Sequence, residues 1–202
     1  MTTTPPAPHP NSYWLPGCRI LAGDYPYSPD PRAGLAKLRR ILDAGVTTFI
    51  DLTQPHELEP YEPALRAEAE ARGIAVEHVR LPIRDMDIPS PQRMREVLDA
   101  IDAACAAGRT VYVHCWGGVG RTGTVVGCHL ARGGLPGPEA LAMVGELFAS
   151  MPSEKLERFP GGSPQTWAQR DFVRTWREPA AAAAVAAPPP SRDGRGGERG
   201  DA

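Results

Sequence analysis

The chain has 202 residues, enough for one domain with a hydrophobic core and too few for two comfortable domains. Hydrophobic residues make up 42%, charged residues 23% and the net charge is −2, so no overall field attracts nucleic acid or an anionic membrane. The sequence has no apolar run long enough to span a membrane and no export signal, so we expect a cytoplasmic protein without nucleic-acid or membrane partners.

The two ends differ in composition from the middle of the chain. Residues 1–12 are rich in Thr and Pro, and we expect them to be flexible. Residues 179–202 form an Ala-, Pro-, Gly- and Arg-rich tail that is expected to be disordered, although its alanine run could extend the last helix. The sequence names no partner for this tail. The segment 13–178 is therefore the predicted folded domain.

Between these ends, strand-like and helix-like segments alternate. Short segments rich in β-branched residues predict an edge strand near residue 20 and central strands at 46–52, 74–81 and 110–115. Amphipathic segments predict helices at 31–43, 63–72, from 91 to just before Gly108, and at 121–132, 138–149 and 164–177. Ser90 followed by Pro91 is a typical helix start, and Gly45, Gly73 and Gly108 follow predicted helix ends. The pattern predicts an α/β three-layer sandwich with a central, mostly parallel sheet flanked by helices.

One segment combines a strand, a glycine-rich loop and a helix. The strand VYVHC runs into WGGVGRTG and then into a helical TVVGCHLAR, an arrangement that typically cradles phosphate. Glycines at 117, 118 and 120 allow the backbone N–H groups to turn inward. The predicted phosphate-binding loop therefore comprises Trp116, Gly117, Gly118, Val119, Gly120 and Arg121.

This loop contains the groups needed for nucleophilic catalysis. Cys115 lies at the end of the strand, where loop amides, the helix dipole and Arg121 all favour a thiolate. The planar guanidinium of Arg121 can bind two phosphate oxygens. The hydroxyl of Thr122 could donate to the cysteine sulfur when it leaves. The remaining cysteines, Cys18, Cys105 and Cys128, follow no metal-ligand or disulfide pattern, and neither a metal nor another cofactor is expected.

The segment HCWGGVGRTG resembles the His-Cys-x5-Arg-Ser/Thr-Gly signature of the protein tyrosine and dual-specificity phosphatase superfamily. LPIRDMDIPSPQRM at 81–94 looks like its general-acid loop, and SPQTWAQ at 163–169 is similar to its Gln-Thr-x-x-Gln segment. The resemblance covers roughly residues 12–177 and is closest to small atypical dual-specificity phosphatases of bacterial type. It implies that 13–178 is a phosphatase domain that works through a phosphocysteine intermediate on Cys115 without a metal.

The resemblance also implies roles for residues outside the loop. It places the general acid at Asp85, although Asp87 lies two residues later and sequence geometry alone does not choose between them. Gln165 is the expected residue that orients the hydrolytic water, with Gln169 as the next candidate. Separately, Ser163 followed by Pro164 predicts the start of the last helix, with Ser163 as its cap. His114 precedes the loop on a strand and is expected to orient it by a hydrogen bond rather than act as a base.

Other interpretations stand beside this one. A Cys-x5-Arg spacing alone also occurs in rhodanese-like and low-molecular-weight phosphatase folds, but the latter place the loop near the N-terminus. A catalytically inactive phosphate-binding module would need a lost nucleophile, arginine or acid, and none is lost here. The expected substrate is a phosphorylated protein or a small phosphomonoester. A phosphoinositide is less favoured because the loop contains no lysine.

Overall fold

The computed structural model describes residues 5–178, so the predicted tail 179–202 lies outside the described part of the chain. A five-stranded sheet lies at its centre, with the strand order β1-β2-β5-β3-β4. The strands are β1 (Ser12–Trp14), β2 (Ile20–Gly23), β3 (Val46–Asp51), β4 (Glu77–Arg80) and β5 (Thr110–His114). Only β1 pairs antiparallel, and β2, β5, β3 and β4 are parallel, which confirms the mostly parallel sheet.

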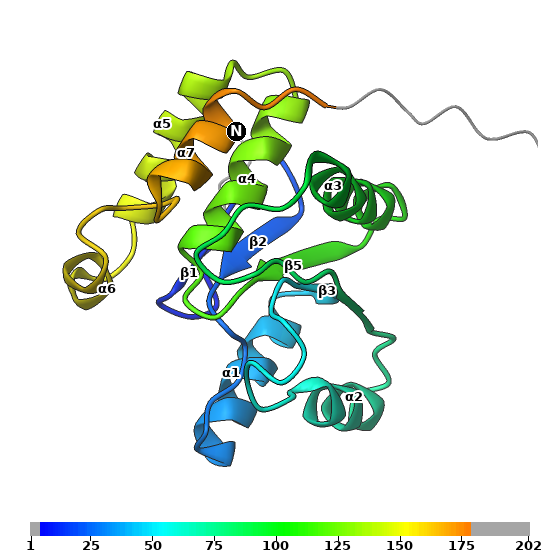
Figure 1. Cartoon of the computed structure of the whole chain (residues 1–202). Coiled ribbons are helices and arrows are strands. Elements are labelled where there is room, and N and C mark those ends of the chain that lie inside the picture. Colours follow the sequence, from blue (N-terminus) through cyan, green and yellow to red (C-terminus); the bar gives the residue numbers. More distant parts are fainter. Residues whose placement is uncertain (1–4, 179–202) are drawn as a thin grey trace, which may run out of the picture.

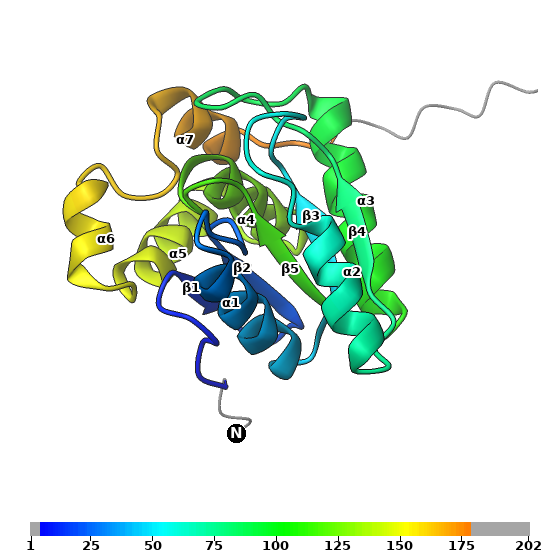
Figure 2. The ribbon, with the colours of Figure 1, turned by 90° about the horizontal axis from the view of Figure 1, so that it is seen from below.

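Helices cover both faces of this sheet (Figure 1). On one face lie α1 (Pro31–Asp43) and α2 (Glu62–Ala71). Figure 2 views the molecule from the side of these two helices, so they lie in front of the sheet. On the other face lie α3 (Pro91–Ala106), α4 (Gly120–Arg132), α5 (Gly137–Ala149) and α7 (Trp167–Arg174). The short α6 (Ser153–Arg158) follows α5 in the chain and lies to one side of these helices. The three-layer α/β sandwich is therefore confirmed. Within residues 5–178, no helix is long and apolar enough to cross a membrane.

The helix ends follow from local chemistry. The Asp30 side chain accepts a hydrogen bond from the backbone N–H of Arg32 at the start of α1, and Ser90 caps α3 through the N–H of Arg93 at 3.1 Å. Proline occupies the first position of both helices, where no N–H is needed. Gly45 and Gly108 follow the two helices with φ of 83° and 75°, a backbone conformation that favours glycine.

Successive residues of the central strands contribute to two separate cores. Phe49 on β3 and Tyr112 on β5 pack against α1 and α2, whereas Ile50, Val111 and Val113 pack against the helices of the other face. Because both faces are buried, these strands are apolar on both sides, which explains their continuous hydrophobic sequence. The two cores hold the central strands in place. Because β3 and β5 pair in parallel, their carboxyl ends lie next to each other.

Some sequence predictions differ from the structure at the edges of the sheet. The strand near residue 20 is β2, an inner strand, because the unpredicted β1 covers its outer side. The predicted central strand at 74–81 is the short edge strand β4. Part of the N-terminal segment expected to be flexible is packed, since His9 is buried and β1 begins at Ser12. Segments this short depend on tertiary contacts that local sequence patterns do not record.

The last helices also differ from the prediction. The helix expected at 164–177 spans only Trp167–Arg174, and α6 at Ser153–Arg158 was not predicted. Thr166, rather than Ser163, is the cap of α7, in a reciprocal capping box with Gln169. The Ser163 hydroxyl instead donates to the carbonyl of Val119 at 2.8 Å. This contact ties the segment before α7 to the loop that opens α4.

Candidate active site

The predicted phosphate-binding loop connects the carboxyl end of β5 to the amino end of α4. Cys115 follows the last residue of β5 and is 2% exposed. The backbone N–H of Gly118 donates to the Cys115 Sγ at 3.2 Å. Gly118 has φ 68°, and a Cβ there would lie 2.5 Å from the Gly23 carbonyl carbon, so the tight loop requires glycine at this position. The sulfur therefore accepts a hydrogen bond from a loop amide, just before the N-terminus of α4.

His114 links the start of this loop to Tyr61 through two hydrogen bonds. Its Nδ1 lies 3.3 Å from the carbonyl oxygen of Cys115, and its Nε2 lies 2.7 Å from the hydroxyl of Tyr61. A neutral ring satisfies both partners if Nδ1–H donates to the carbonyl and Nε2 accepts from Tyr61. Burial lowers the pKa of His114 to about 4, so the ring is neutral near pH 7. His114 is therefore placed next to the loop, and its orienting role stays a prediction.

Acidification should destabilise the protein through this histidine. The folded-state pKa of about 4 lies below the ordinary value of 6.5, so the unfolded chain binds more protons between these values. The contribution of His114 is present above pH 6.5 and is lost as pH falls toward 4, by ~3 kcal/mol across that window. Urea unfolding of wild type and His114→Asn at several pH values measures this loss. The free energy of unfolding should change less steeply with pH in the variant than in wild type.

A matched variant and a second histidine make this result interpretable. Burial also lowers the pKa of His9, to about 3, so some of the pH dependence should persist in His114→Asn. His56 is exposed on the loop after β3, and His56→Asn should retain the wild-type slope. An unchanged slope in His114→Asn would contradict a neutral His114 in the folded protein.

Arg121 is buried at the first turn of α4, with an exposure of 1%, and is held by Glu57. Its Nη1 and Nη2 lie 2.8 and 2.6 Å from the two carboxylate oxygens of Glu57. Nη1 also donates to the carbonyl of Ile83 at 3.2 Å, whereas the buried Nε has no hydrogen-bond partner among residues 5–178. Among the described residues, Nε is therefore the unused donor of this guanidinium, while Nη2 also lies 3.0 Å from the Asp85 Oδ1.

Glu57 was not predicted as part of the site. It lies on the loop after β3, and sequence alone offered no means of choosing between it and neighbouring acidic residues such as Glu59. Burial works to raise the pKa of Glu57, but the hydrogen bonds from Arg121 outweigh it and lower the pKa, so Glu57 is ionised. The available signal was topological, since loops at the carboxyl edge of neighbouring parallel strands converge on one site.

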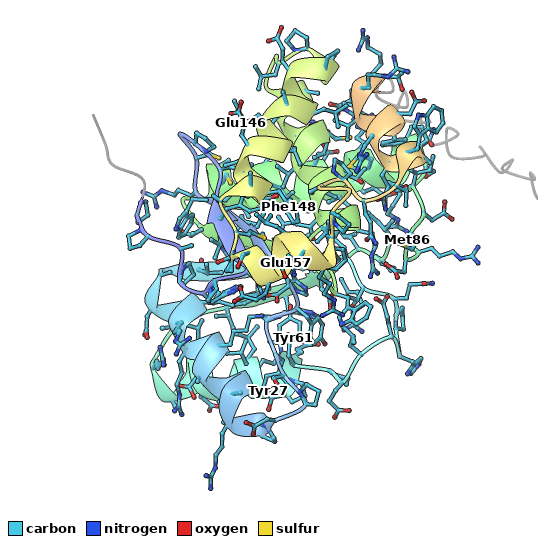
Figure 3. The ribbon with its side chains drawn as sticks, turned by 90° about the vertical axis from the view of Figure 1, so that its left-hand side faces the viewer. Tyr27, Tyr61, Met86, Glu146, Phe148 and Glu157 are labelled. Atoms are coloured by element: carbon cyan, nitrogen blue, oxygen red, sulfur yellow. The ribbon has the colours of Figure 1, made fainter. Side chains whose placement is uncertain are left out.

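The two candidate acids lie in different surroundings. The Asp85 Oδ1 lies 3.0 Å from Nη2 of Arg121, and its side chain is 51% exposed. Asp87 instead accepts a hydrogen bond from the N–H of Ile88 at 2.8 Å, next to the exposed Met86 (Figure 3). Of the two carboxylates, the structure brings only that of Asp85 to Arg121, within the described residues.

The two glutamines also differ. The Oε1 of Gln169 accepts from the backbone N–H groups of Gln165 and Thr166, and its Nε2 donates to the carbonyl of Asp87 at 3.1 Å. Gln169 thus joins the start of α7 to the acid loop. The half-buried side chain of Gln165 makes no hydrogen bond within the described chain, and its Cβ lies near Gly120 of the loop. Its amide is free to bind a water molecule.

Thr122 has an unused hydroxyl in this structure. Its side chain is fully buried, and its hydroxyl has no hydrogen-bond partner within residues 5–178. Its expected donation to the Cys115 sulfur concerns the step in which the sulfur leaves, and it stays a prediction. Among the described residues, no group of three or more His, Cys, Asp or Glu side chains could hold a metal ion.

Comparisons with known proteins match this arrangement. Residues 10–173 match the family model PTP-SAK, described as Swiss Army Knife protein, DSP-PTPase phosphatase domain. Phosphatidylglycerophosphate phosphatase PTPMT1 from Arabidopsis thaliana is 28% identical over 122 residues, which are 60% of this chain and 32% of that protein. The match thus spans about a third of the relative's length.

Two solved structures are similar in fold. Tk-PTP in a glycine-to-alanine mutant form has a TM-score of 0.57 and 26% identity, over 82% of this chain and 93% of that one. Kinase associated phosphatase, crystallised with its catalytic cysteine replaced by serine, has a TM-score of 0.60 and 19% identity, over 76% and 83% of the two chains.

Proposed function

From the premise that this chain belongs to the DSP-PTPase phosphatase family, we propose that it hydrolyses phosphomonoesters through a phosphocysteine on Cys115. The observation that carries the proposal is the hydrogen bond from the amide of Gly118 to the Cys115 sulfur, in a loop that ends at Arg121 in the first turn of α4. Turnover of a simple aryl phosphate in the presence of EDTA tests it. Saturating release of phosphate is expected, and its absence would favour a phosphate-binding module without catalysis.

In the first step, the Cys115 thiolate attacks the phosphorus in line with the leaving oxygen. The S–P bond forms, the bond from phosphorus to the leaving oxygen breaks, and the acid Asp85 gives its proton to that oxygen. The loop N–H groups and the Nε and Nη2 edge of Arg121 stabilise the charge on the equatorial oxygens. Because Glu57 fixes the guanidinium beforehand, this stabilisation needs no rearrangement of Arg121 during the reaction.

In the second step, water hydrolyses the phosphocysteine. The amide of Gln165 orients the water, and the Asp85 carboxylate accepts its proton as the oxygen attacks the phosphorus. The S–P bond breaks, the thiolate is restored and inorganic phosphate is released. Gln169 acts as a positioning residue in this scheme, because its hydrogen bonds join Gln165 to the backbone of the acid loop.

The proposed substrate class is a phosphomonoester of a protein or of a small molecule. Trp116 is 52% exposed at the mouth of the site, so an open site that accepts several leaving groups fits better than a deep slot. The relative from Arabidopsis thaliana carries the name of a lipid phosphatase, which supports small-molecule and lipid phosphates as candidates beside phosphotyrosyl proteins. A panel of phosphotyrosyl, phosphoseryl and phosphoinositide substrates separates these candidates.

Asp85→Asn should slow esters with poor leaving groups much more than activated esters. A protonated acid matters most when the leaving oxygen is basic, and general-acid catalysis contributes roughly 10²–10⁴-fold. We therefore expect a loss of that size with alkyl and phenyl phosphates and a small loss with a nitrophenyl ester. Asp87→Asn is the matched control, because its carboxylate bonds a local backbone N–H. If the leaving-group dependence appears in Asp87→Asn instead, the assignment is reversed.

Gln165→Ala should slow the second step selectively. Without the amide, water is poorly oriented, so phosphocysteine accumulates while the first step remains fast. Stopped-flow measurement should record a burst of released nitrophenol followed by slower turnover. Gln169→Ala removes three hydrogen bonds that order the acid loop and α7, and it should impair both steps together. A Gln165→Ala enzyme with no burst and unchanged kcat would contradict this role.

A further inference from the structure

A pocket of about 380 Å³ opens between the phosphate-binding loop and α6. Trp116 and Gly117 line it on the loop side, and Lys155 and Arg158 line it on the α6 side. The two sides are in contact, because a Cβ added at Gly117 would lie 3.4 Å from the ring of Phe159. Figure 3 shows α6, marked by Glu157, between α5, marked by Glu146, and α1. The pocket thus shares a wall with the loop proposed to hold the scissile phosphate.

Lys155 is a buried cation that forms no ion pair with a described residue of this pocket. The residue is 9% exposed, and within residues 5–178 its ammonium has no ion pair or hydrogen bond. Its Nζ lies 5.3 Å from the centroid of the Phe159 ring, and burial lowers its pKa. A buried charge without a partner is costly, and a bound anion would relieve that cost. The sequence contains only one other lysine, Lys37, and that one is paired with Asp24.

Arg158 provides a second cation on the same wall. Its guanidinium carbon lies 5.8 Å from the centroid of the Trp116 ring and 5.6 Å from that of Phe159. Stacking of this kind holds the plane of the guanidinium while its N–H edges stay free to bind an anion. Arg158 forms no ion pair with any residue that the structure describes.

The acidic groups of the pocket form no ion pair with these two cations in the described part of the chain. Asp24 also lines the pocket, but its carboxylate is bound by the Lys37 ammonium and by the Asn11 amide at 3.0 Å. Glu154 lies on the first turn of α6 and is exposed. The α6 wall therefore presents Lys155 and Arg158 to an anion that enters beside Trp116.

We propose that Lys155 and Arg158 form a second anion subsite for a substrate that carries another phosphate group besides the scissile phosphomonoester. The second group is a phosphomonoester or a phosphodiester on the same small molecule or lipid headgroup. Because both phosphates belong to one substrate, the subsite rests on the proposed hydrolysis at Cys115. The absence of lysine from the phosphate-binding loop does not oppose this subsite. Both cations come from α6, which was not predicted and which lies beside the loop.

Matched substrates test the subsite. The probes are a series of alkanediol bisphosphates of increasing chain length, each compared with the monophosphate of the same diol. At the best length, the wild-type protein should prefer the bisphosphate in kcat/KM by about tenfold or more, the effect of one charge-assisted hydrogen bond. Lys155→Met and Arg158→Gln should each reduce this ratio toward one. Arg66→Gln, an exposed change on α2 that removes the same charge, should retain it.

The sources of the second phosphate are separated by a further arm. The two probes are a short-chain phosphatidylinositol phosphate and its deacylated headgroup, which both carry a phosphomonoester and a phosphodiester. If the natural substrate is a lipid, the acylated form should be hydrolysed faster than the headgroup. Preference for a bisphosphate that persists in both Lys155→Met and Arg158→Gln would overturn the proposal. It would also be overturned if these two substitutions lower kcat/KM only for phosphopeptides that carry an acidic residue next to the phosphorylated one.

Binding measurements distinguish failure of the subsite from failure of catalysis. If wild type hydrolyses monophosphates but has no bisphosphate preference at any length, the subsite is wrong and the proposed hydrolysis stands. If no ester is hydrolysed, the proposed function fails, and calorimetry of the alkanediol bisphosphates with Cys115→Ser then decides the subsite. Arg158→Gln is then added to Cys115→Ser. A bisphosphate affinity about tenfold weaker in this double variant supports the subsite, and an unchanged affinity overturns it.

Discussion

Cys115→Ser should abolish turnover while it leaves oxyanion binding largely intact. A serine hydroxyl is not ionised near neutral pH, so it is a poor nucleophile in a loop that depends on a thiolate. We expect kcat to fall by about 10⁴-fold or more, as when other covalent nucleophiles are removed. The Gly118 amide and the Arg121 guanidinium remain in the variant, so vanadate should still bind. Phosphate-release assays and vanadate titration measure the two properties.

Cysteines away from the loop provide the control for this result. Cys128 lies on α4 and is fully buried, and burial raises the pKa of its thiol. Cys128→Ser should therefore keep kcat/KM near the wild-type value, and peroxide followed by thiol should inactivate and rescue both wild type and Cys128→Ser. Hydrolysis retained in Cys115→Ser would be inconsistent with covalent catalysis at this residue.

Arg121→Lys should be a severe change although it preserves the charge. The Nη1 and Nη2 edge of the arginine binds Glu57, its Nε and Nη2 edge is proposed to bind phosphate, and an ammonium cannot do both. We expect kcat/KM to fall by about 10²–10³-fold, the cost of losing an oxyanion donor, and vanadate affinity to fall with it. Steady-state kinetics and vanadate inhibition measure these losses.

Glu57→Gln separates the orientation of Arg121 from its charge. The amide keeps one hydrogen-bond acceptor but loses the symmetric fork, so Arg121 becomes less fixed while its charge persists. The loss in kcat/KM should be smaller than in Arg121→Lys, and Glu59→Gln on the same loop should have no comparable effect. If Arg121→Lys retains kcat/KM near wild type, the arginine has a structural role and the proposed oxyanion contact is wrong.

The central elements of the fold could be predicted because their signals are local. The cap at Ser90, the glycine after α3 and the apolar strands 46–52 and 110–115 each record a physical requirement of one segment. The positions of β1 and α6 could not be predicted in this way. Three residues of β1 form a strand only because β2 offers an open edge, and α6 is a six-residue helix packed by Phe159 against the loop.

The loop of the candidate site was visible in the sequence, but the contacts around it were not. The glycines and the Cys115 to Arg121 spacing describe one continuous segment, so chain order alone suffices. Glu57, Tyr61 and Lys155 reach the site from distant segments, and no periodicity marks them. The different surroundings of Asp85 and Asp87 likewise could not be predicted, because both residues lie on one short loop with a turn at Met86, where φ is 60°.

Direct detection of the intermediate tests the central claim. The Gln165→Ala protein is mixed with a nitrophenyl phosphate, quenched in acid during the burst and digested, and the peptide that contains Cys115 is weighed by mass spectrometry. The mechanism predicts one added phosphoryl group on Cys115, lost on longer incubation and absent from Cys115→Ser. Catalytic release of phosphate by wild type, with no phosphoryl group on Cys115 at any quench time in either protein, would contradict it.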